Sequence, residues 1–315
     1  LFFVLGILAT AARTDLRFPE PLYASLTMYL LVAIGFKGGV AVAQAGLGAV
    51  WLPALAAAAL GALIPLWSYP ILRYAGRFSP VDAAAVAAHY GSVSAVTFMA
   101  AVSYLQERAQ PFEPYASALL AVMESPAIVV GVVLGRIAGR TGRPQAGALA
   151  KLALHEGLLG RSVFLLLGSM LVGFLSGERG MAATAGFFVT PFQGILALVL
   201  FEMGMVAARR FGDLRRVGPF LVGFGLAMPL VHGAIGSGLG ALCGLSEGGS
   251  MLLGVLAASA SYIAAPAAMR LSLPEANPTL YLTAALAITF PFNIVVGLPI
   301  YAWMARFWHE GGPLS

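Results

Sequence analysis

Long apolar runs separated by short polar connections dominate the pattern of this 315-residue chain. A membrane-spanning helix needs about 20 mainly apolar residues, and on that rule the pattern predicts ten spans. The connections carry the proline, glycine and charged residues expected at helix ends, as at 76–80 and 273–275. The predicted spans cover residues 1–12, 21–42, 50–72, 81–106, 114–138, 160–176, 182–207, 217–243, 250–270 and 277–308. The sequence therefore predicts an all-α polytopic membrane protein.

The composition supports this prediction. Hydrophobic residues make up 60% of the chain and charged residues only 10%, whereas a soluble domain carries about a quarter charged residues. Most of the surface must therefore face membrane lipid. Residues 1–9 are apolar without a basic start or a cleavage site, so we interpret them as a membrane helix and not as a signal peptide. The net charge of +5 follows the loops and forms no basic, aromatic-rich patch, so nucleic-acid binding is not expected.

The two halves of the chain resemble each other at an offset of 165 residues. The matched pairs are Ser94 with Ser259, Ala95 with Ala260, and Pro126 with Pro291. Five spans per half is an odd number, so the second half must enter the membrane inverted, as in many secondary transporters. This predicts a first inverted repeat at 1–138, a cytoplasmic linker at 139–159 and a second inverted repeat at 160–315.

The distribution of positive charge provides an independent test of the topology. Lysine and arginine collect in cytoplasmic loops. With the N-terminus outside, ten spans place 14 of the 18 lysines and arginines on the cytoplasmic side. Lys37, near the outer end of span 2, is one of the other four. The split predicts ten spans with both termini on the extracytoplasmic side.

Polar groups inside spans 4 and 9 are the strongest candidates for a binding site, because polar groups at membrane depth are costly and usually functional. The candidates are Ser94, Ala95 and Thr97 in span 4 and Ser259, Ala260 and Ser261 in span 9. Hydroxyls and freed amides at a broken helix can hold a small oxyanion. The alternative is that these small residues only allow close helix packing. Their occurrence in both halves favours a site.

Two carboxylates, Glu124 and Glu202, lie deep within predicted spans. Either could ligate sodium, which prefers hard oxygen donors, or carry a proton as a coupling group. Asn293, close to the repeat equivalent of Glu124, could add a carbonyl ligand. The alternative is a structural pair with Lys37 or His232.

No motif indicates an enzyme. The chain has no phosphate loop, HExxH or dinucleotide fingerprint. Residues 244–248 spell Gly-x-Ser-x-Gly, but that motif requires a strand-to-helix turn, and here it connects two predicted spans. The four histidines have no metal-ligand spacing, and the single Cys243 excludes a disulfide framework. We therefore expect no catalysis and no cofactor apart from sodium as a coupling ion.

Taken in order, these stretches resemble the sodium-dependent bicarbonate permease family, best known from cyanobacterial carbon-concentrating systems. The resemblance covers nearly the whole chain and rests on the ordered set of motifs. The motifs are Gly-Ser-Val-Ser-x-x-Thr at 91–97, Glu-Ser-Pro-Ala at 124–127, Met-Gly-Met at 203–205, Gly-Asp-Leu-Arg at 212–215, Val-His-Gly at 231–233, Ala-Ala-Ser-x-Ser at 257–261 and Pro-Glu-Ala-Asn-Pro at 274–278.

The resemblance implies a ten-helix inverted repeat with gate and core domains that move in an elevator-like manner, assembled as a homotrimer. It implies that bicarbonate and sodium bind beside the small-residue stretches of spans 4 and 9. The residues that match the family's site are Ser94, Thr97, Ser259 and Ser261. Glu124 and Tyr262 stand where cyanobacterial members carry aspartate. A PII-like regulatory protein is a partner in the family, whose long acidic linker is here the shorter segment 136–159.

We therefore expect a secondary-active transporter of a small anion. It would lie in the cell (inner) membrane, surrounded by lipid. Sodium-coupled bicarbonate uptake is the leading hypothesis. One alternative is transport of another small anion with proton coupling or without sodium. Others are a channel and a non-transporting membrane scaffold or sensor. A channel needs a continuous polar stripe, whereas the polar residues here form separate clusters.

Overall fold

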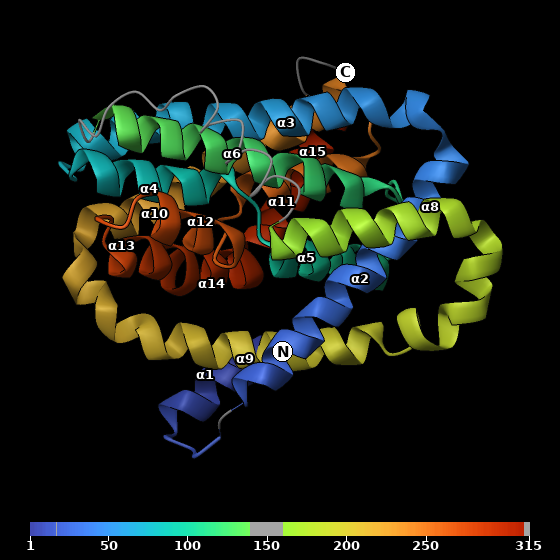
Figure 1. Cartoon of the computed structure of the whole chain (residues 1–315), viewed down its shortest axis with the longest axis horizontal. Coiled ribbons are helices and arrows are strands. Elements are labelled where there is room, and N and C mark those ends of the chain that lie inside the picture. Colours follow the sequence, from blue (N-terminus) through green and yellow to red (C-terminus); the bar gives the residue numbers. More distant parts are fainter. Residues whose placement is uncertain (17, 139–159, 312–315) are drawn as a thin grey trace.

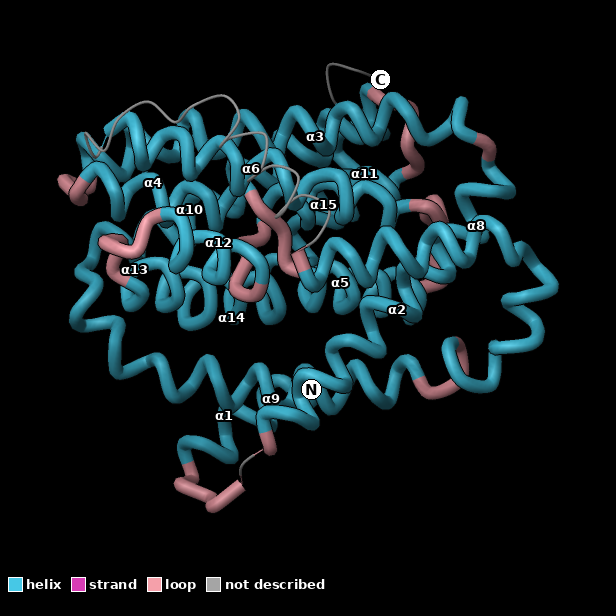
Figure 2. The backbone as a smooth tube through the Cα atoms, in the orientation of Figure 1, coloured by secondary structure: helices cyan, strands magenta, loops and turns pink. Residues whose placement is uncertain are grey.

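The computed structural model describes residues 1–16, 18–138 and 160–311, so the predicted linker at 139–159 lies outside the described residues. All regular secondary structure in these ranges is helical (Figures 1 and 2). Seven stretches are long and apolar enough to cross a membrane: Glu20–Ala45, Leu47–Ala75, Pro80–Glu107, Ala116–Ala138, Arg161–Phe188, Phe192–Leu242 and Pro278–Glu310. The chain is therefore an all-helical, multi-pass membrane protein, as the hydrophobic pattern predicts.

The helices of the first half are α1 (Phe2–Ala11), α2 (Glu20–Ala45), α3 (Leu47–Pro70), α4 (Pro80–Gly91), α5 (Ala95–Glu107) and α6 (Ala116–Ala138). Those of the second half are α8 (Arg161–Phe188), α9 (Phe192–Arg210), α10 (Leu214–Leu242), α11 (Glu247–Ala258), α12 (Ala264–Ser272), α13 (Pro278–Thr283), α14 (Phe290–Phe292) and α15 (Leu298–Glu310). Short π-helical segments join α13, α14 and α15 into one long stretch.

Two groups of helices pack mainly among themselves. In the first, α2 lies along α8 and α1 lies along α9; in the second, α10 packs on α11 and α15, while α3, α4 and α6 pack on one another (Figure 1). Glycine allows the close approach of α2 and α8. A Cβ at Gly39 would lie 1.9 Å from Met170 O, and one at Gly173 would lie 2.1 Å from Phe36 O. Such small-residue contacts replace the hydrophobic driving force that helices lack in lipid.

The predicted connection at 176–180 coincides with a break at Gly177 (φ 57°, ψ −155°), where two helical segments of α8 meet. The second segment ends at Phe188, and a further turn at 189–191 leads into α9. The stretch Phe192–Leu242 contains two predicted spans and is divided at Gly218 (φ 80°, ψ 161°). A positive φ is open to glycine at little steric cost, so the chain can bend sharply there.

Predicted spans 4 and 9, which carry the candidate polar residues, are both broken helices. α4 and α11 each have twelve residues and begin at a serine, Ser79 or Ser246, whose side chain accepts from the N–H three residues on. Each ends at a serine in the same extended conformation, Ser92 (φ −86°, ψ 167°) and Ser259 (φ −86°, ψ 165°). The helix starts Pro80 and Glu247 align the two halves here at an offset of 167, two more than the sequence comparison predicts.

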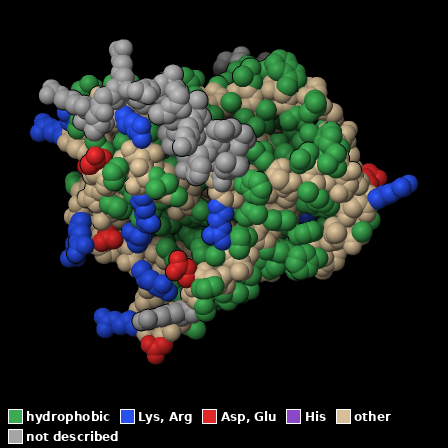
Figure 3. Space-filling model, in the orientation of Figure 1, with side chains coloured by type: hydrophobic (Ala, Val, Ile, Leu, Met, Phe, Trp, Pro, Cys, Tyr) green, Lys and Arg blue, Asp and Glu red, His purple; other side chains and the backbone are tan. Residues whose placement is uncertain are grey.

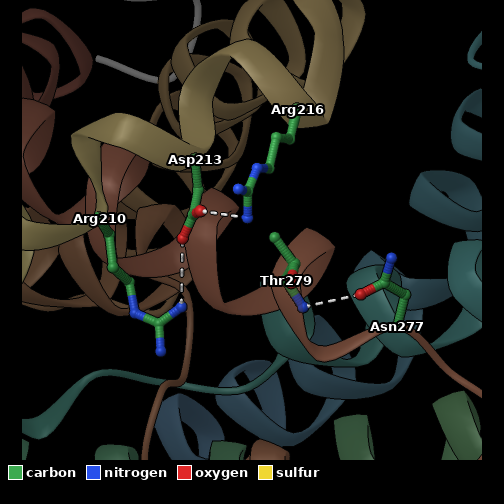
Figure 4. A network of polar contacts seen from close by, with 5 residues as sticks. All are labelled: Arg210, Asp213, Arg216, Asn277 and Thr279. Atoms are coloured by element: carbon green, nitrogen blue, oxygen red, sulfur yellow. Dashed lines mark hydrogen bonds and ion pairs between the residues drawn. The ribbon is translucent and has the colours of Figure 1, made fainter.

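A carboxylate connects the start of each broken helix to a loop from the other half of the chain. Asp82 in α4 accepts from the N–H of Asn277 at 2.7 Å, and Asn277 in turn caps α13 through Thr279 (Figure 4). Glu113, before α6, accepts from the N–H of Ser246 at 2.7 Å and from its hydroxyl at 3.0 Å. A charge-assisted bond of this kind is stronger than a neutral one, so both broken helices are held at their starts.

Basic side chains gather at one end of the molecule. In Figure 3 they lie over the left-hand end of the view, while most of the remaining visible surface is hydrophobic. The helices run across this view, so the charged end corresponds to one set of helix termini (Figure 1). This segregation is the pattern that lipid on the sides and water at the ends would produce.

Candidate binding site at the two broken helices

The two helix breaks lie against each other in the protein interior. The backbone N–H of Ser94 donates to Ser259 Oγ at 2.9 Å, and the N–H of Ser261 donates to the carbonyl oxygen of His89 at 2.8 Å. A break leaves backbone groups without intrahelical partners, which is costly away from water. Here each break supplies partners that the other lacks, so neither is stable in this form alone.

Hydroxyl oxygens accept hydrogen bonds from the first turn of both half-helices that leave the breaks, although only α5 has a side-chain N-cap. Ser94 Oγ accepts from the N–H of Thr97 at 3.2 Å and from its hydroxyl at 2.8 Å. Ser261 Oγ accepts from the N–H of Ala265 at 3.2 Å. The N-termini of α5 and α12 carry partial positive charge. The breaks therefore bring together two positive helix ends and several hydroxyls.

All four predicted hydroxyl residues are buried there: Ser94, Thr97, Ser259 and Ser261. Ala95 is the first residue of α5, and Ala260 is a buried residue of the second break. Neither alanine has a polar side chain, so each can offer a ligand only its backbone amide or carbonyl. The structure thus gathers the six residues predicted for anion binding at one place. Two of the four hydroxyls already donate, Thr97 to Ser94 Oγ at 2.8 Å and Ser259 to the carbonyl oxygen of Leu256 at 2.8 Å. The donors that a compact anion can use are therefore the Ser94 and Ser261 hydroxyls and the unbonded amides at the helix starts.

Tyr262 lies within the second break and directs a buried hydroxyl toward the first. That hydroxyl lies close to Ser94 but makes no hydrogen bond of normal geometry within the described part of the chain. Its ring packs edge-on against Phe290, with centroids 5.4 Å apart. A buried hydroxyl without a partner costs free energy, and each such group calls for an explanation, an absent ligand being one.

A cavity of about 380 Å³ extends from Tyr262 toward the basic end of the molecule. Arg210 and Arg270 line it together with Tyr23. Arg210 is oriented by Asp213, with Nη1 3.9 Å from Oδ2, and Arg216 contacts the other oxygen of the same carboxylate at 3.5 Å (Figure 4). The sequence reading used these arginines only for topology. The prediction that both lie on the same side of the membrane was the signal that could have identified them as a basic approach to the site.

Glu124 lies on α6, with its carboxylate buried. Ser162 Oγ donates to its Oε1 at 3.5 Å, which is a long and weak contact. A neighbouring cavity of about 200 Å³ is lined by Ser162, Arg161 and Tyr23. Neither Lys37 nor His232 pairs with Glu124 in the described residues. The structural pairing that the sequence left open is therefore not found.

Glu202 and Asn293 have different surroundings. Glu202 lies on α9 with Oε2 buried and lacking a hydrogen-bond partner among the described residues. Asn293 instead uses both ends of its amide, since Nδ2 donates to Ala258 O at 3.0 Å and Oδ1 accepts from the Tyr301 hydroxyl at 2.7 Å. Asn293 thus holds the end of α11 beside the second break, and its carbonyl oxygen keeps one lone pair for a further partner.

His89 is a component of the site for which the sequence predicts no role. Its carbonyl oxygen accepts from Ser261, and its ring stacks on Tyr281 with centroids 4.4 Å apart. Nδ1 contacts Ala85 O at 2.6 Å, whereas Nε2 is buried without a partner among the described residues. His89 therefore joins the two breaks through its backbone. Residue type gave no signal for this, because the bonded atom is a carbonyl that every residue has.

No cluster of three or more His, Cys, Asp or Glu side chains that could hold a metal ion occurs in the described ranges. Sodium needs no such cluster, because hydroxyl and backbone carbonyl oxygens are suitable hard donors. The break regions contain both kinds of group.

The comparison with known families agrees with this geometry. The model of the Na⁺-dependent bicarbonate transporter superfamily matches residues 1–306. The chain belongs to this superfamily. A search among curated proteins finds no match.

Proposed function

We propose that the protein is a secondary-active transporter of a small anion, with sodium-coupled bicarbonate uptake as the leading function. The observation that supports this most strongly is the contact between two broken helices, in which Ser94 donates to Ser259 at 2.9 Å. Secondary transporters commonly hold substrate and coupling ions at discontinuous helices near the membrane midplane. Membership of the superfamily favours bicarbonate and sodium within that class.

Ten membrane crossings in two inverted halves fit the described helices. The 51-residue stretch Phe192–Leu242 is long enough to cross twice, with its bend at Gly218. The short apolar helix α1 and the α11–α12 pair supply two further crossings. The similar lengths, caps and ends of α4 and α11 support a repeat, and five crossings in each half make the repeat inverted. Both termini then lie outside the cytoplasm.

The anion is bound, in this proposal, between the N-termini of α5 and α12. The hydroxyls of Ser94, Thr97, Ser259 and Ser261 and the backbone of Ala95 and Ala260 are the groups that we assign to it. The ligand must be compact because the breaks are in direct contact. Arg210 and Arg270 raise the local concentration of anions at the cytoplasmic mouth of the cavity.

The coupling ion has its own set of candidate ligands. We assign sodium to oxygen atoms near the second break, with Tyr262 the nearest candidate and Glu124, Glu202 and Asn293 further candidates. The specific alternative is proton coupling, or transport without sodium. Two observations favour this alternative: Tyr262 has no carboxylate, and Glu124 has only one weak hydrogen bond.

The two packing groups suggest how substrate is carried. In an elevator-like mechanism, α1, α2, α8 and α9 form the gate, and the remaining helices form the core that carries the breaks. We further propose a homotrimer in the cell (inner) membrane, in contact with lipid. Regulation by a PII-like protein follows only from the family, and the linker on which it would depend lies outside the described residues.

Uptake of labelled bicarbonate into proteoliposomes tests this function. We expect uptake that rises with an inward sodium gradient and falls to background when potassium replaces sodium. Uptake that is unchanged by sodium but stimulated by a proton gradient would establish the alternative coupling. Absence of uptake under every gradient, with folded protein confirmed by size-exclusion chromatography, would refute bicarbonate transport.

The double variant Ser94→Ala/Ser259→Ala tests the site. We expect at least a tenfold fall in initial uptake rate, because a hydroxyl ligand and a hydrogen bond between the breaks are both lost. Ser237→Ala is the matched control, since Ser237 is a fully buried serine on α10 that lies against Gly254, away from the breaks. Equal uptake by the double variant and the control would show that the break serines serve only in packing.

A further inference from the structure

A second polar cavity lies between the two helix groups, at the end of the molecule opposite Arg210 and Arg270. Its volume is about 150 Å³. Its walls come from α2, α5, α6, α9 and the loop before α6, and the polar groups among them are Lys37, Gln106 and Ser117. The end is opposite because α9 begins beside this cavity, at Phe192, and ends beside the other, at Arg210.

Lys37 is an unpaired cation within a membrane-crossing helix. It lies eight residues before the end of α2, which at 1.5 Å per residue is roughly 12 Å from the helix end. Its side chain is partly buried, and its ammonium lies over the ring of Phe192, 4.5 Å from the centroid. No carboxylate forms an ion pair with it in the part of the chain that the structure describes. A lone charge at membrane depth is costly and usually functional.

The Ser117 hydroxyl lacks a partner at the same place. Ser117 is 3% exposed, and its Oγ makes no hydrogen bond with the described residues. A Cβ at Gly38 would lie 1.8 Å from this oxygen, so the hydroxyl is in contact with the residue that follows Lys37. Two unsatisfied donors of different kinds, an ammonium and a hydroxyl, therefore line one cavity from two helices.

Gln106 provides a third donor at the exposed mouth. Its Oε1 accepts from Gln193 at 2.9 Å, and Gln193 Oε1 accepts from Ser103 at 3.0 Å. Because its oxygen already accepts from Gln193, the NH2 group is the end of the Gln106 amide that we assign to the cavity. The other walls are mainly apolar, with Phe98, Phe112 and Phe192 among them. Apolar walls strengthen an electrostatic contact by excluding water.

We propose that this cavity is a second binding site for a small monovalent anion such as bicarbonate, nitrate or chloride. Lys37 supplies the charge, Ser117 a hydroxyl donor and Gln106 an amide donor at the entrance. One positive charge that forms no ion pair among the described residues suits a single negative charge, and the volume accommodates a small ion with a few waters. The cation–π contact with Phe192 stabilises the ammonium without neutralising it. This site is separate from the helix breaks and does not depend on the proposed transport function.

Thermal unfolding of the purified full chain in detergent, titrated with sodium nitrate, tests the proposal. The double variant Ser94→Ala/Ser259→Ala serves as the background, so that anion binding at the helix breaks contributes least to the shift of the unfolding midpoint. An anion that binds only the folded state raises the unfolding midpoint in a saturable way. We expect such a rise in the background and in a Lys37→Arg derivative. In Lys37→Met and Ser117→Ala derivatives we expect at least a tenfold higher half-saturating nitrate concentration.

Two further variants separate charge from shape. Arg179→Gln removes an exposed charge that does not line the cavity, and we expect it to retain the nitrate response. Val102→Phe keeps Lys37 but fills the cavity, and we expect it to lose the response. An unchanged response in both Lys37→Met and Val102→Phe would overturn the proposal. Because no gradient is involved, that failure would leave the bicarbonate uptake test unaffected.

A lipid phosphate could offer the same chemistry from a different source. Adding phosphatidylglycerol in place of nitrate is the experimental arm for that ligand, and we expect no Lys37-dependent change in the midpoint. A Lys37-dependent rise with lipid and none with nitrate would refute the free-anion site.

Discussion

The two broken helices begin alike but differ at their breaks. The first break is three residues long, from Ser92 to Ser94, and the second is five residues long, from Ser259 to Ile263. α5 starts from a serine cap reinforced by Thr97, whereas α12 starts from Ile263 without a side-chain cap. The longer break also carries Tyr262 and borders the cavity that leads to Arg210.

This difference teaches that a repeated sequence can give two unequal halves of one site. The first break is short and internally capped, so it presents a fixed set of donors. The second is longer and braced from outside by Asn293, and two of its residues, Tyr262 and Ile263, line the cavity. We infer that the first break chiefly holds the ligand and that the second admits it. Four variants can test this inference, beginning with the one of largest expected effect.

Asn293→Ala should destabilise the protein most. It removes the hydrogen bond by which Asn293 holds the end of α11 beside the second break, and we expect the first break to stay intact. It leaves two buried groups without partners, the Ala258 carbonyl and the Tyr301 hydroxyl. Each unsatisfied group costs about 1–3 kcal/mol, so we expect the free energy of unfolding to fall by about 2–5 kcal/mol. Urea titration in detergent measures this. A loss under about 1 kcal/mol would show that the second break supports itself.

Ser94→Ala and Ser261→Ala compare the caps of the two breaks directly. Ser94 is the true N-cap of α5, so its loss should cost about 1–2 kcal/mol, whereas Ser261 makes one looser bond to Ala265 and should cost roughly half as much. Unfolding midpoints of the two variants, measured side by side, check the order. Equal losses would mean that the breaks are equivalent despite their different lengths.

Tyr262→Phe should have the smallest effect on stability and a selective effect on transport. It removes a buried hydroxyl that lacks a hydrogen-bond partner in the described structure, so we expect a change within about 0.5 kcal/mol. If the hydroxyl contacts substrate or sodium, the KM for one of them rises severalfold in uptake assays, while the unfolding midpoint stays the same. A marked loss of stability with unchanged KM would assign Tyr262 to packing instead.

The sequence predicts much of the fold because the cost of exposing polar groups to lipid is severe and local. Apolar runs had to be helical, and the two runs rich in serine and alanine are the ones that break. The six break residues were predicted from their position within spans. The offset of 165 pairs Ser94 with Ser259, and these two residues turn out to be in contact, whereas the helix starts Pro80 and Glu247 align at 167. Similarity of residue type could not show whether two residues are equivalent in the repeat or are in contact with each other.

Other parts of the site could not be predicted. His89 contributes a carbonyl oxygen, and carbonyl oxygens leave no trace in residue type. Asn293 was expected to offer a ligand oxygen, but Tyr301, eight residues further along the same helical stretch, already donates to it. Lys37 was considered as a partner for a carboxylate and instead lines a cavity with Ser117. In each case the partner was set by how the helices pack.

By itself, the sequence determined that this chain is a multi-pass helical membrane protein, that its basic residues belong mostly to one side, and where its helices break. Each of these follows from the free energy of placing individual residues in lipid or water, which depends on local sequence. Only the tertiary structure decided which break faces which, which polar groups stay unsatisfied and where the cavities lie. Those outcomes depend on distances between residues from separate helices, such as the 2.9 Å between Ser94 N and Ser259 Oγ.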